Sequence, residues 1–218
     1  MTGSADTGQR GRRLVEASAF GLGMVLFALC SHRGWPWIAA GAAGLVAAAF
    51  SIQSSCAYAR DIPALFGLSA LPLKVIPIGL AGSAAGFGLG VFYRVSFGMA
   101  AVPPSLEPFV LAACAIGAAE ELVYRGWMQG RLRILGRPAA ILIAAAAHAA
   151  YKTALFALPA SPIGVDYRLI AAWTLGAGAL FGLLRELSDG VLPPVAAHVT
   201  FDLLVYGAVA RAPWWVWT

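Results

Sequence analysis

Two carboxylates and one guanidinium interrupt an otherwise apolar stretch, "LAACAIGAAEELVYRGWMQGRL", at residues 111–132. Glu121 and Arg125 are four residues apart, so on a helix they share a face and can form an ion pair. Glu120 lies about 100° from Glu121 on the helical wheel, so it can face a different cavity. Charges inside a bilayer are costly and mark functional sites by default. These residues are therefore candidates for chemistry.

Two later apolar segments carry further ionisable groups that could join them. Glu120 and His148 each lie about 16 Å along their helices from an arginine at a helix end. His198 lies roughly 10 Å beyond a predicted turn, and Asp202, four residues on, shares its face. Three helices would thus bring Glu120, His148 and His198 to comparable depths in the membrane.

Such a set of side chains fits two kinds of hydrolytic chemistry. A carboxylate near two imidazoles can act as general base on a water molecule, while the imidazoles polarise a carbonyl or stabilise an oxyanion. Glu120, His148 and His198 could instead hold one zinc ion with an open coordination position. The residues alone leave both alternatives open, so the cofactor is either none or one zinc ion.

The elements that must position these groups are membrane-spanning helices. The chain has 218 residues, is 60% hydrophobic and 11% charged, and has a mean hydropathy of +0.78. Long continuous apolar runs favour helices over a β-barrel, and each span needs about 20 residues. We predict an all-α polytopic integral membrane protein with about seven transmembrane helices in one bundle. The candidate spans are residues 14–31, 35–55, 72–93, 107–130, 138–157, 167–185 and 191–209.

The ends of the chain are polar or aromatic. Residues 1–13 predict a disordered cytoplasmic tail, residues 14–210 a single membrane-embedded domain, and residues 211–218, with "WWVWT", an interfacial tail. The arginines before the first apolar run raise the possibility of a signal peptide. No small-x-small cleavage site follows, so we expect an uncleaved first helix.

Positive charges lie at helix ends, where they determine topology. This placement argues against nucleic acid as a partner, despite a sequence pI of about 9.4. With the N-terminus in the cytoplasm, the cytoplasmic side would hold Arg10, Arg12, Arg13, Arg60, Lys74, Arg131, Arg133, Arg137 and Arg185. The outside would hold only Arg33, Arg94, Arg168 and Arg211. The bias favours a cytoplasmic N-terminus.

Small residues and cysteines have simpler interpretations. Gly82, Gly86 and Gly90 recur at four-residue spacing, which predicts a close helix–helix contact. Gly136 is expected to end one helix and Asp189–Gly190 to form a turn before the last. The cysteines, Cys30, Cys56 and Cys114, are odd in number and indicate neither a disulfide framework nor a Cys-ligand metal site.

Three blocks of the sequence resemble the CPBP family of intramembrane proteases, which includes Rce1-like CAAX prenyl endopeptidases and bacterial Abi proteins. "EELVYRGWMQGRL" is similar to the family's EExxxR motif, and "AAAAHAA" around His148 to its second motif. "GLLRELSDGVLPPVAAHVTFDLL" is similar to the third block, with HxxxD at His198 and Asp202. The resemblance covers about residues 62–206.

The resemblance implies a glutamate-dependent peptidase working inside the membrane. Glu120 would activate water, Glu121 and Arg125 would support it, His148 would orient water or substrate, and His198 with Asp202 would form the oxyanion site.

The chain departs from the family at two positions. Ala144 replaces an aromatic residue, which changes the pocket's shape. Asp202 replaces an asparagine, and an ionised aspartate cannot donate to an oxyanion. Asp202 would therefore be protonated, orient His198 or, as a better ligand than asparagine, favour a metal.

We therefore expect an intramembrane endopeptidase, in a bacterial inner membrane, acting on a peptide or membrane-anchored protein. Substrates could be exported peptides, sorting tags or bacteriocins. Two alternatives stay open: a non-catalytic scaffold or immunity factor of the same fold, and a small proton-coupled transporter. Loss of any one of Glu120, His148 and His198 would have favoured the scaffold, and inverted repeats would have favoured the transporter.

Overall fold

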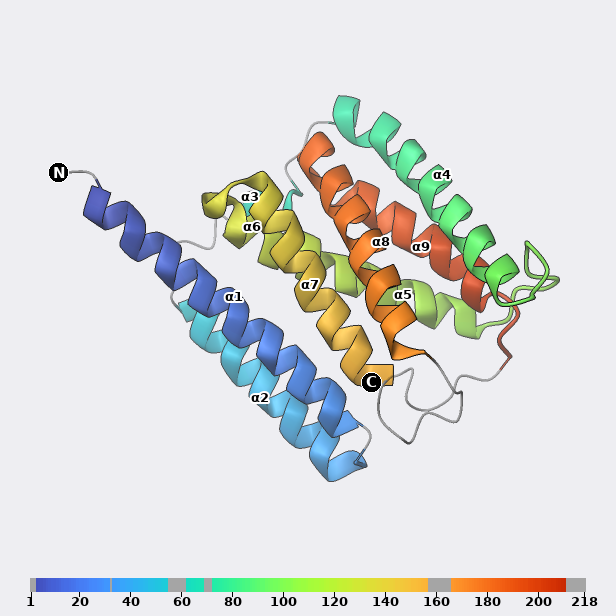
Figure 1. Cartoon of the computed structure of the whole chain (residues 1–218), viewed down its shortest axis with the longest axis horizontal. Coiled ribbons are helices and arrows are strands. Elements are labelled where there is room, and N and C mark those ends of the chain that lie inside the picture. The colour runs from blue at the N-terminus through green and yellow to red at the C-terminus, as the bar shows by residue number, and fades with distance from the viewer. Residues whose placement is uncertain (1–2, 32, 55–61, 69–71, 157–165, 211–218) are drawn as a thin grey trace. The chain divides into compact units, whose positions relative to one another are not determined.

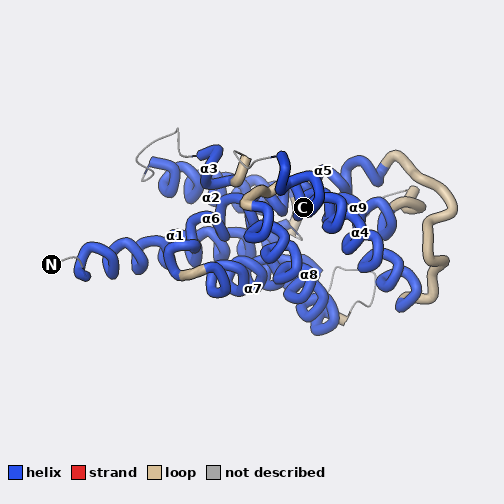
Figure 2. The backbone as a smooth tube through the Cα atoms, turned by 90° about the horizontal axis from the view of Figure 1, so that it is seen from above, coloured by secondary structure: helices blue, strands red, loops and turns tan. Residues whose placement is uncertain are grey.

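A computed structural model of the chain describes residues 3–31, 33–54, 62–68, 72–156 and 166–210. Throughout these ranges the backbone is helix, turn or loop, without a strand (Figure 2). The elements are α1 (Gly3–Ser31), α2 (Trp35–Ser54), α3 (Ile62–Phe66), α4 (Pro72–Ser96), α5 (Phe109–Glu121), the π-helix η2 (Leu122–Met128), α6 (Gln129–Leu132), the 3-10 helix η3 (Arg133–Leu135), α7 (Arg137–Phe156), α8 (Tyr167–Ser188) and α9 (Leu192–Tyr206). The predicted all-α class is confirmed.

The membrane character of the fold follows from the length and composition of these helices. Four described segments are long and apolar enough to cross a bilayer: Gly8–Ser31, Pro72–Ser96, Arg137–Phe156 and Tyr167–Ser188. Shorter apolar helices cover Pro36–Val46 and Leu192–Tyr206. At about 1.5 Å per residue, α9 is about 22 Å long, short of the roughly 30 Å of a bilayer core. The chain is an integral membrane protein of polytopic type.

Backbone contacts divide the chain into two compact units. Unit one contains α1, α2, α7 and α8 up to Ala179, and unit two contains α4, α5, η2, α9 and the rest of α8 (Figure 1). Each unit is described separately below.

In unit one, α1 lies beside α2, and α1 also packs against α7 (Figure 1). The polar residues before Leu14 were expected to be disordered, and this expectation was wrong, since α1 begins at Gly3. The physical reason is a set of contacts one turn apart: Arg12 and Arg13 both pair with Glu16, at 3.0 and 3.3 Å. Such pairs stabilise a helix where apolar packing is absent.

In unit two, α4 packs closely against α9 through the predicted glycine face (Figure 1). A Cβ on Gly82 would lie 2.8 Å from the Pro193 carbonyl oxygen, and one on Gly86 would meet the Ala197 carbonyl. A Cβ on Gly90 would lie 2.7 Å from Leu204. The predicted close contact is therefore confirmed, because only glycine lets the two backbones approach this closely.

The helix directions in unit two agree with alternating crossings of a membrane. Later residues of α4 meet later residues of α9, so these two helices run parallel. On α5, Phe109 meets Tyr206, and Cys114 contacts the Val199 carbonyl. Helix α5 therefore runs antiparallel to α9, as expected when two further spans, α7 and α8, lie between them in the chain.

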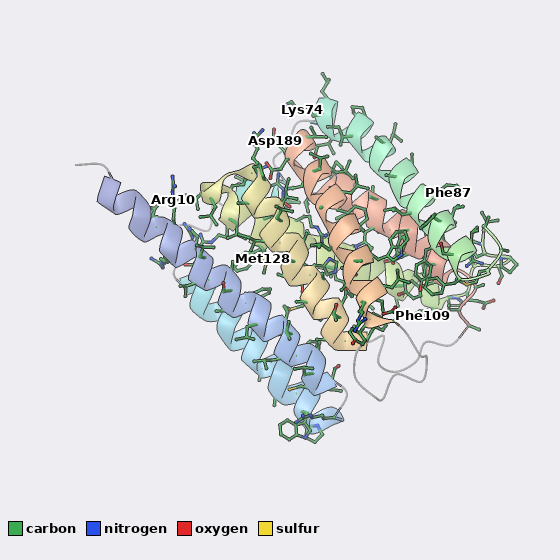
Figure 3. All side chains as sticks on the ribbon, viewed as in Figure 1. Arg10, Lys74, Phe87, Phe109, Met128 and Asp189 are labelled. Atoms are coloured by element: carbon green, nitrogen blue, oxygen red, sulfur yellow. The ribbon has the colours of Figure 1, made fainter. Side chains whose placement is uncertain are left out.

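Turn signals in the sequence are confirmed around the last helices. Gly136 has φ 98° between η3 and α7, and Asp189 has φ 55° before α9, whose first turn contains proline. Lys74 reaches the Asp189 carboxylate at 3.6 Å, near the start of α4 (Figure 3).

Arg94 lies in the last turn of α4, at a helix end as expected for a topology determinant. It is buried, and its guanidinium donates to the carbonyls of Ala100 (2.6 Å) and Leu204 (2.9 Å). The Leu204 carbonyl lies in the last turn of α9, where backbone acceptors lack helical partners. Arg94 thus caps α9. Arg60, Cys56 and the aromatic tail 211–218 lie outside the described residues.

The span expected at residues 107–130 is not one regular helix. It is α-helical only to Glu121, and the π-helix η2 then covers "LVYRGWM". π-helical turns are rare and frequently occur at functional sites. Gly126 and Gly130 face the short helix α3, since a Cβ on either would collide with Phe66 or Leu65. Helix α3, five residues long, was not predicted.

Candidate active site

Glu121 is the centre of a buried polar group in unit two. Its Oε1 accepts a hydrogen bond from Arg125 Nη1 at 3.1 Å and lies 2.8 Å from His198 Nδ1. Glu121 and Arg125 have no exposed surface. An ionised carboxylate only accepts hydrogen bonds, so with Glu121 in that form His198 Nδ1 is the donor of this contact. The predicted ion pair is confirmed, and it also fixes the imidazole.

The other imidazole nitrogen faces two more carboxylates. His198 Nε2 lies 3.9 Å from Glu120 Oε2 and 3.8 Å from Asp202 Oδ2. Glu120 and Glu121 therefore approach the two nitrogens of one imidazole. Neighbouring residues of a helix point about 100° apart, and a flat imidazole ring placed between their side chains can approach both. We call Glu120, Glu121, Arg125, His198 and Asp202 the acid-rich cluster.

The backbone of α5 comes close to the acid-rich cluster at Gly117. A Cβ there would overlap Asp202 Oδ2 and lie 3.0 Å from His198 Cδ2. Gly117 is three residues before Glu120, so it lies on nearly the same face of α5. Sequence reasoning missed Gly117, although a glycine one turn before the first glutamate was the available signal.

Phe181 of α8 covers one side of the same cluster. Its ring centre lies 5.6 Å from that of His198, and the Arg125 guanidinium lies 5.8 Å from the ring. The second contact is within cation–π range. Phe181 was not predicted, because an apolar residue in an apolar helix gives no sequence signal.

Beyond η2, a buried amide attaches this segment to α8. Gln129 Nε2 donates to the Gly182 carbonyl at 3.0 Å and to Glu186 Oε1 at 2.8 Å. Gln129 is fully buried and Glu186 nearly so. Together with the Arg125–Phe181 contact, these bonds hold the middle of the π-helical segment and the residue after it against one helix.

His148 is buried on α7, where its ring stacks on Tyr151 with centroids 6.5 Å apart. It belongs to unit one, whereas Glu120 and His198 belong to unit two. Its predicted role with Glu120 therefore stays a prediction.

A zinc ion is the alternative to a metal-free site, and the described ranges of the chain bear on it. Within these ranges, no group of three or more His, Cys, Asp or Glu side chains is arranged to hold a metal ion. We therefore derive no step through a metal.

Residues 102–204 match the family model of the type II CAAX prenyl endopeptidase, Rce1-like. The matched stretch contains all five residues of the acid-rich cluster and His148. No curated protein and no solved structure matches the chain.

Proposed function

We propose that the chain, whose residues 102–204 match the Rce1-like CAAX prenyl endopeptidase model, is an endopeptidase that uses Glu120 as general base and His198 as oxyanion donor. The match to the Rce1-like family model supports an intramembrane endopeptidase in general. The observation that carries the finer assignment is the position of His198, held at Nδ1 by Glu121 with Nε2 beside Glu120.

In the proposed reaction, Glu120 removes a proton from a water molecule, and the resulting hydroxide attacks the carbonyl carbon of the scissile peptide bond. The negative charge on the carbonyl oxygen is stabilised by a hydrogen bond from His198 Nε2–H. The C–N bond then breaks, and Glu120 returns its proton to the leaving amine. The products are a carboxylic acid and an amine, and Glu120 is again ionised.

This mechanism requires His198 to be doubly protonated, and the charges around it support that state. Glu120, Glu121 and Asp202 supply three carboxylates, and Arg125 supplies one guanidinium. An imidazolium would reduce the remaining negative charge. Because Nδ1 donates to Glu121, only the imidazolium has a proton left on Nε2 for an oxyanion.

We assign Asp202 to orienting His198 rather than to donating to the oxyanion. An ionised Asp202 would attract the Nε2 proton in the resting enzyme and release it as the oxyanion forms. We further assign His148 to orienting water or substrate, and Glu121 with Arg125 to supporting the cluster.

The proposed substrate is a peptide or membrane-anchored protein whose scissile bond enters the membrane, such as an exported peptide, a sorting tag or a bacteriocin. The proposed location is a bacterial inner membrane with the N-terminus in the cytoplasm. The excess of arginine and lysine on one set of helix ends supports this orientation.

The test compares peptide termini in cells that express wild type, Glu120→Gln or Glu107→Gln at equal membrane levels. Glu107 is the matched control because its side chain accepts from Ser105 in an exposed loop. We expect new termini with wild type and Glu107→Gln but not with Glu120→Gln. Identical termini in all three would contradict the proposal and favour a scaffold or immunity factor.

Asp202 variants separate its two conceivable roles. If Asp202 orients His198 by charge, Asp202→Asn lowers the cleavage rate because the neutral amide attracts the Nε2 proton less. If it donates to the oxyanion instead, Asp202→Asn retains or raises the rate, while Asp202→Ala lowers it. Initial rates of the two variants in the same membranes decide between the roles.

A further inference from the structure

Three guanidiniums meet one carboxylate in unit one: two lie on α1, before the matched residues, and the third is Arg131, within the first of the quoted sequence blocks. Glu16 on α1 accepts from Arg12 Nε at 3.0 Å and from Arg13 Nη1 at 3.3 Å. Arg131 of α6 donates to the same carboxylate. We call Arg12, Arg13, Glu16 and Arg131 the arginine cluster.

The arginine cluster has more positive than negative charge. The cluster itself contains three guanidiniums and one carboxylate, and Arg10, Arg133 and Arg137 lie in the same two segments. Residues 3–17 and 131–137 contain six arginines against two acids, Asp6 and Glu16. Such an excess attracts anions.

The exposure of the arginines leaves room for an anion at the cluster's surface. Glu16 and Arg131 are buried, with side chains 9% and 7% exposed. Arg12 is 57% exposed and Arg13 27%. The buried pair thus fixes the cluster, while the two α1 arginines present donors outward.

The place of the cluster on its helices points to the membrane surface. The apolar span of α1 begins at Gly8 and that of α7 at Arg137, so Arg12 and Arg13 lie in the first turns of one span and Arg131 precedes the other, and the two helices pack together. At such ends, arginines commonly determine topology without binding anything specific. Here, however, three converge on one carboxylate instead of spreading into solvent.

We propose that the arginine cluster binds the phosphate headgroup of an anionic lipid. A phosphodiester offers oxygens that match guanidinium donors in geometry and charge. Basic pockets between helices near a membrane surface are suited to such headgroups. The lipid's acyl chains would lie along the apolar surface of α1, where Leu22 and Leu26 are more than half exposed.

The test is lipid retention by the purified full chain in mixed vesicles of phosphatidylglycerol and phosphatidylcholine, measured by native mass spectrometry. We expect wild type to retain phosphatidylglycerol preferentially. The double variant Arg12→Gln/Arg13→Gln should lose this preference by roughly fivefold per arginine. Arg12→Lys/Arg13→Lys keeps the charge and should retain most of the preference.

The controls separate this site from other causes. Arg168→Gln removes an arginine at the start of another helix, where it lies over Tyr167, and should leave retention unchanged. Excess inorganic phosphate tests for a free-anion site. Displacement of the lipid by phosphate, equal loss in Arg168→Gln, or no preference in wild type would each overturn the proposal. Circular dichroism of the double variant Arg12→Gln/Arg13→Gln shows whether its helices are intact. If they are not, lipid retention by Arg12→Lys/Arg13→Lys is the test.

Discussion

The two buried glutamate clusters of this protein have opposite charge balances. In the acid-rich cluster, Glu121 meets one guanidinium and one imidazole, and two more carboxylates stand beside that imidazole. In the arginine cluster, Glu16 meets three guanidiniums. Both contain a buried ion pair, yet an ion pair alone does not define a function. The net charge of the cluster distinguishes the two functions that we propose. An excess of carboxylates suits proton transfer, and an excess of guanidiniums suits anion binding.

The largest predicted effect comes from neutralising the centre of the acid-rich cluster. Glu121→Gln leaves Arg125 buried without its ionised partner, so we expect a loss of about 3–5 kcal/mol in the free energy of unfolding. The measurement is denaturant unfolding in mixed micelles, with Glu107→Gln as control. A loss no larger than that of Glu107→Gln would show that Glu121 carries no buried charge.

The second prediction tests whether the acid-rich cluster depends on helix packing. Gly86→Ala would place a Cβ against the Ala197 carbonyl next to His198, and we expect a loss of about 1–3 kcal/mol. Gly88→Ala is the matched control, since a Cβ there has nothing within 4 Å. The same unfolding assay compares them. Equal stability of the two variants would mean that α4 and α9 do not pack as described.

The third prediction concerns the centre of the arginine cluster. Glu16→Gln removes the only carboxylate that Arg131 meets in the described residues, but Arg12 and Arg13 keep access to water. We therefore expect a smaller loss of unfolding free energy than for Glu121→Gln, about 1–2 kcal/mol. Retention of anionic lipid should increase, because the net positive charge rises. Decreased retention would contradict the charge-balance argument.

The smallest predicted effect is that of Arg12→Gln. Its side chain is more than half exposed, and exposed ion pairs contribute about 0.2–1 kcal/mol to stability. We expect a change in unfolding free energy within that range, and a stronger effect at low salt than at high salt. A loss as large as that of Glu16→Gln would mean that Arg12 is part of the buried core.

The helix ends could be predicted closely from the sequence because apolar runs and turn residues determine them locally. The predicted span 167–185 corresponds to α8, which ends at Ser188, and the predicted span 35–55 corresponds to α2, which ends at Ser54. The π-helical turn after Glu121 could not be predicted, since its residues have no distinct helical period. Helix α3 contains a proline and only five residues, so it gave no periodic signal.

The candidate site was predicted in composition but not in arrangement. The Glu121–Arg125 ion pair could be predicted from the four-residue spacing alone, because residues one helical turn apart lie on the same face. The contact of both glutamates with His198 depends on how α5 meets α9, and that depends on Gly117, whose role is visible only in three dimensions. The arginine cluster was missed for the same reason: Glu16 and Arg131 are 115 residues apart.

The most direct test of the central claim is peptide hydrolysis by the purified protein in lipid vesicles. The substrate would be a peptide recovered from the comparison of termini. We predict that wild type and Glu107→Gln cleave it at equal rates, and that Glu120→Gln is slower by at least about a hundredfold, as expected for loss of a general base. Cleavage by Glu120→Gln at the wild-type rate would contradict the account.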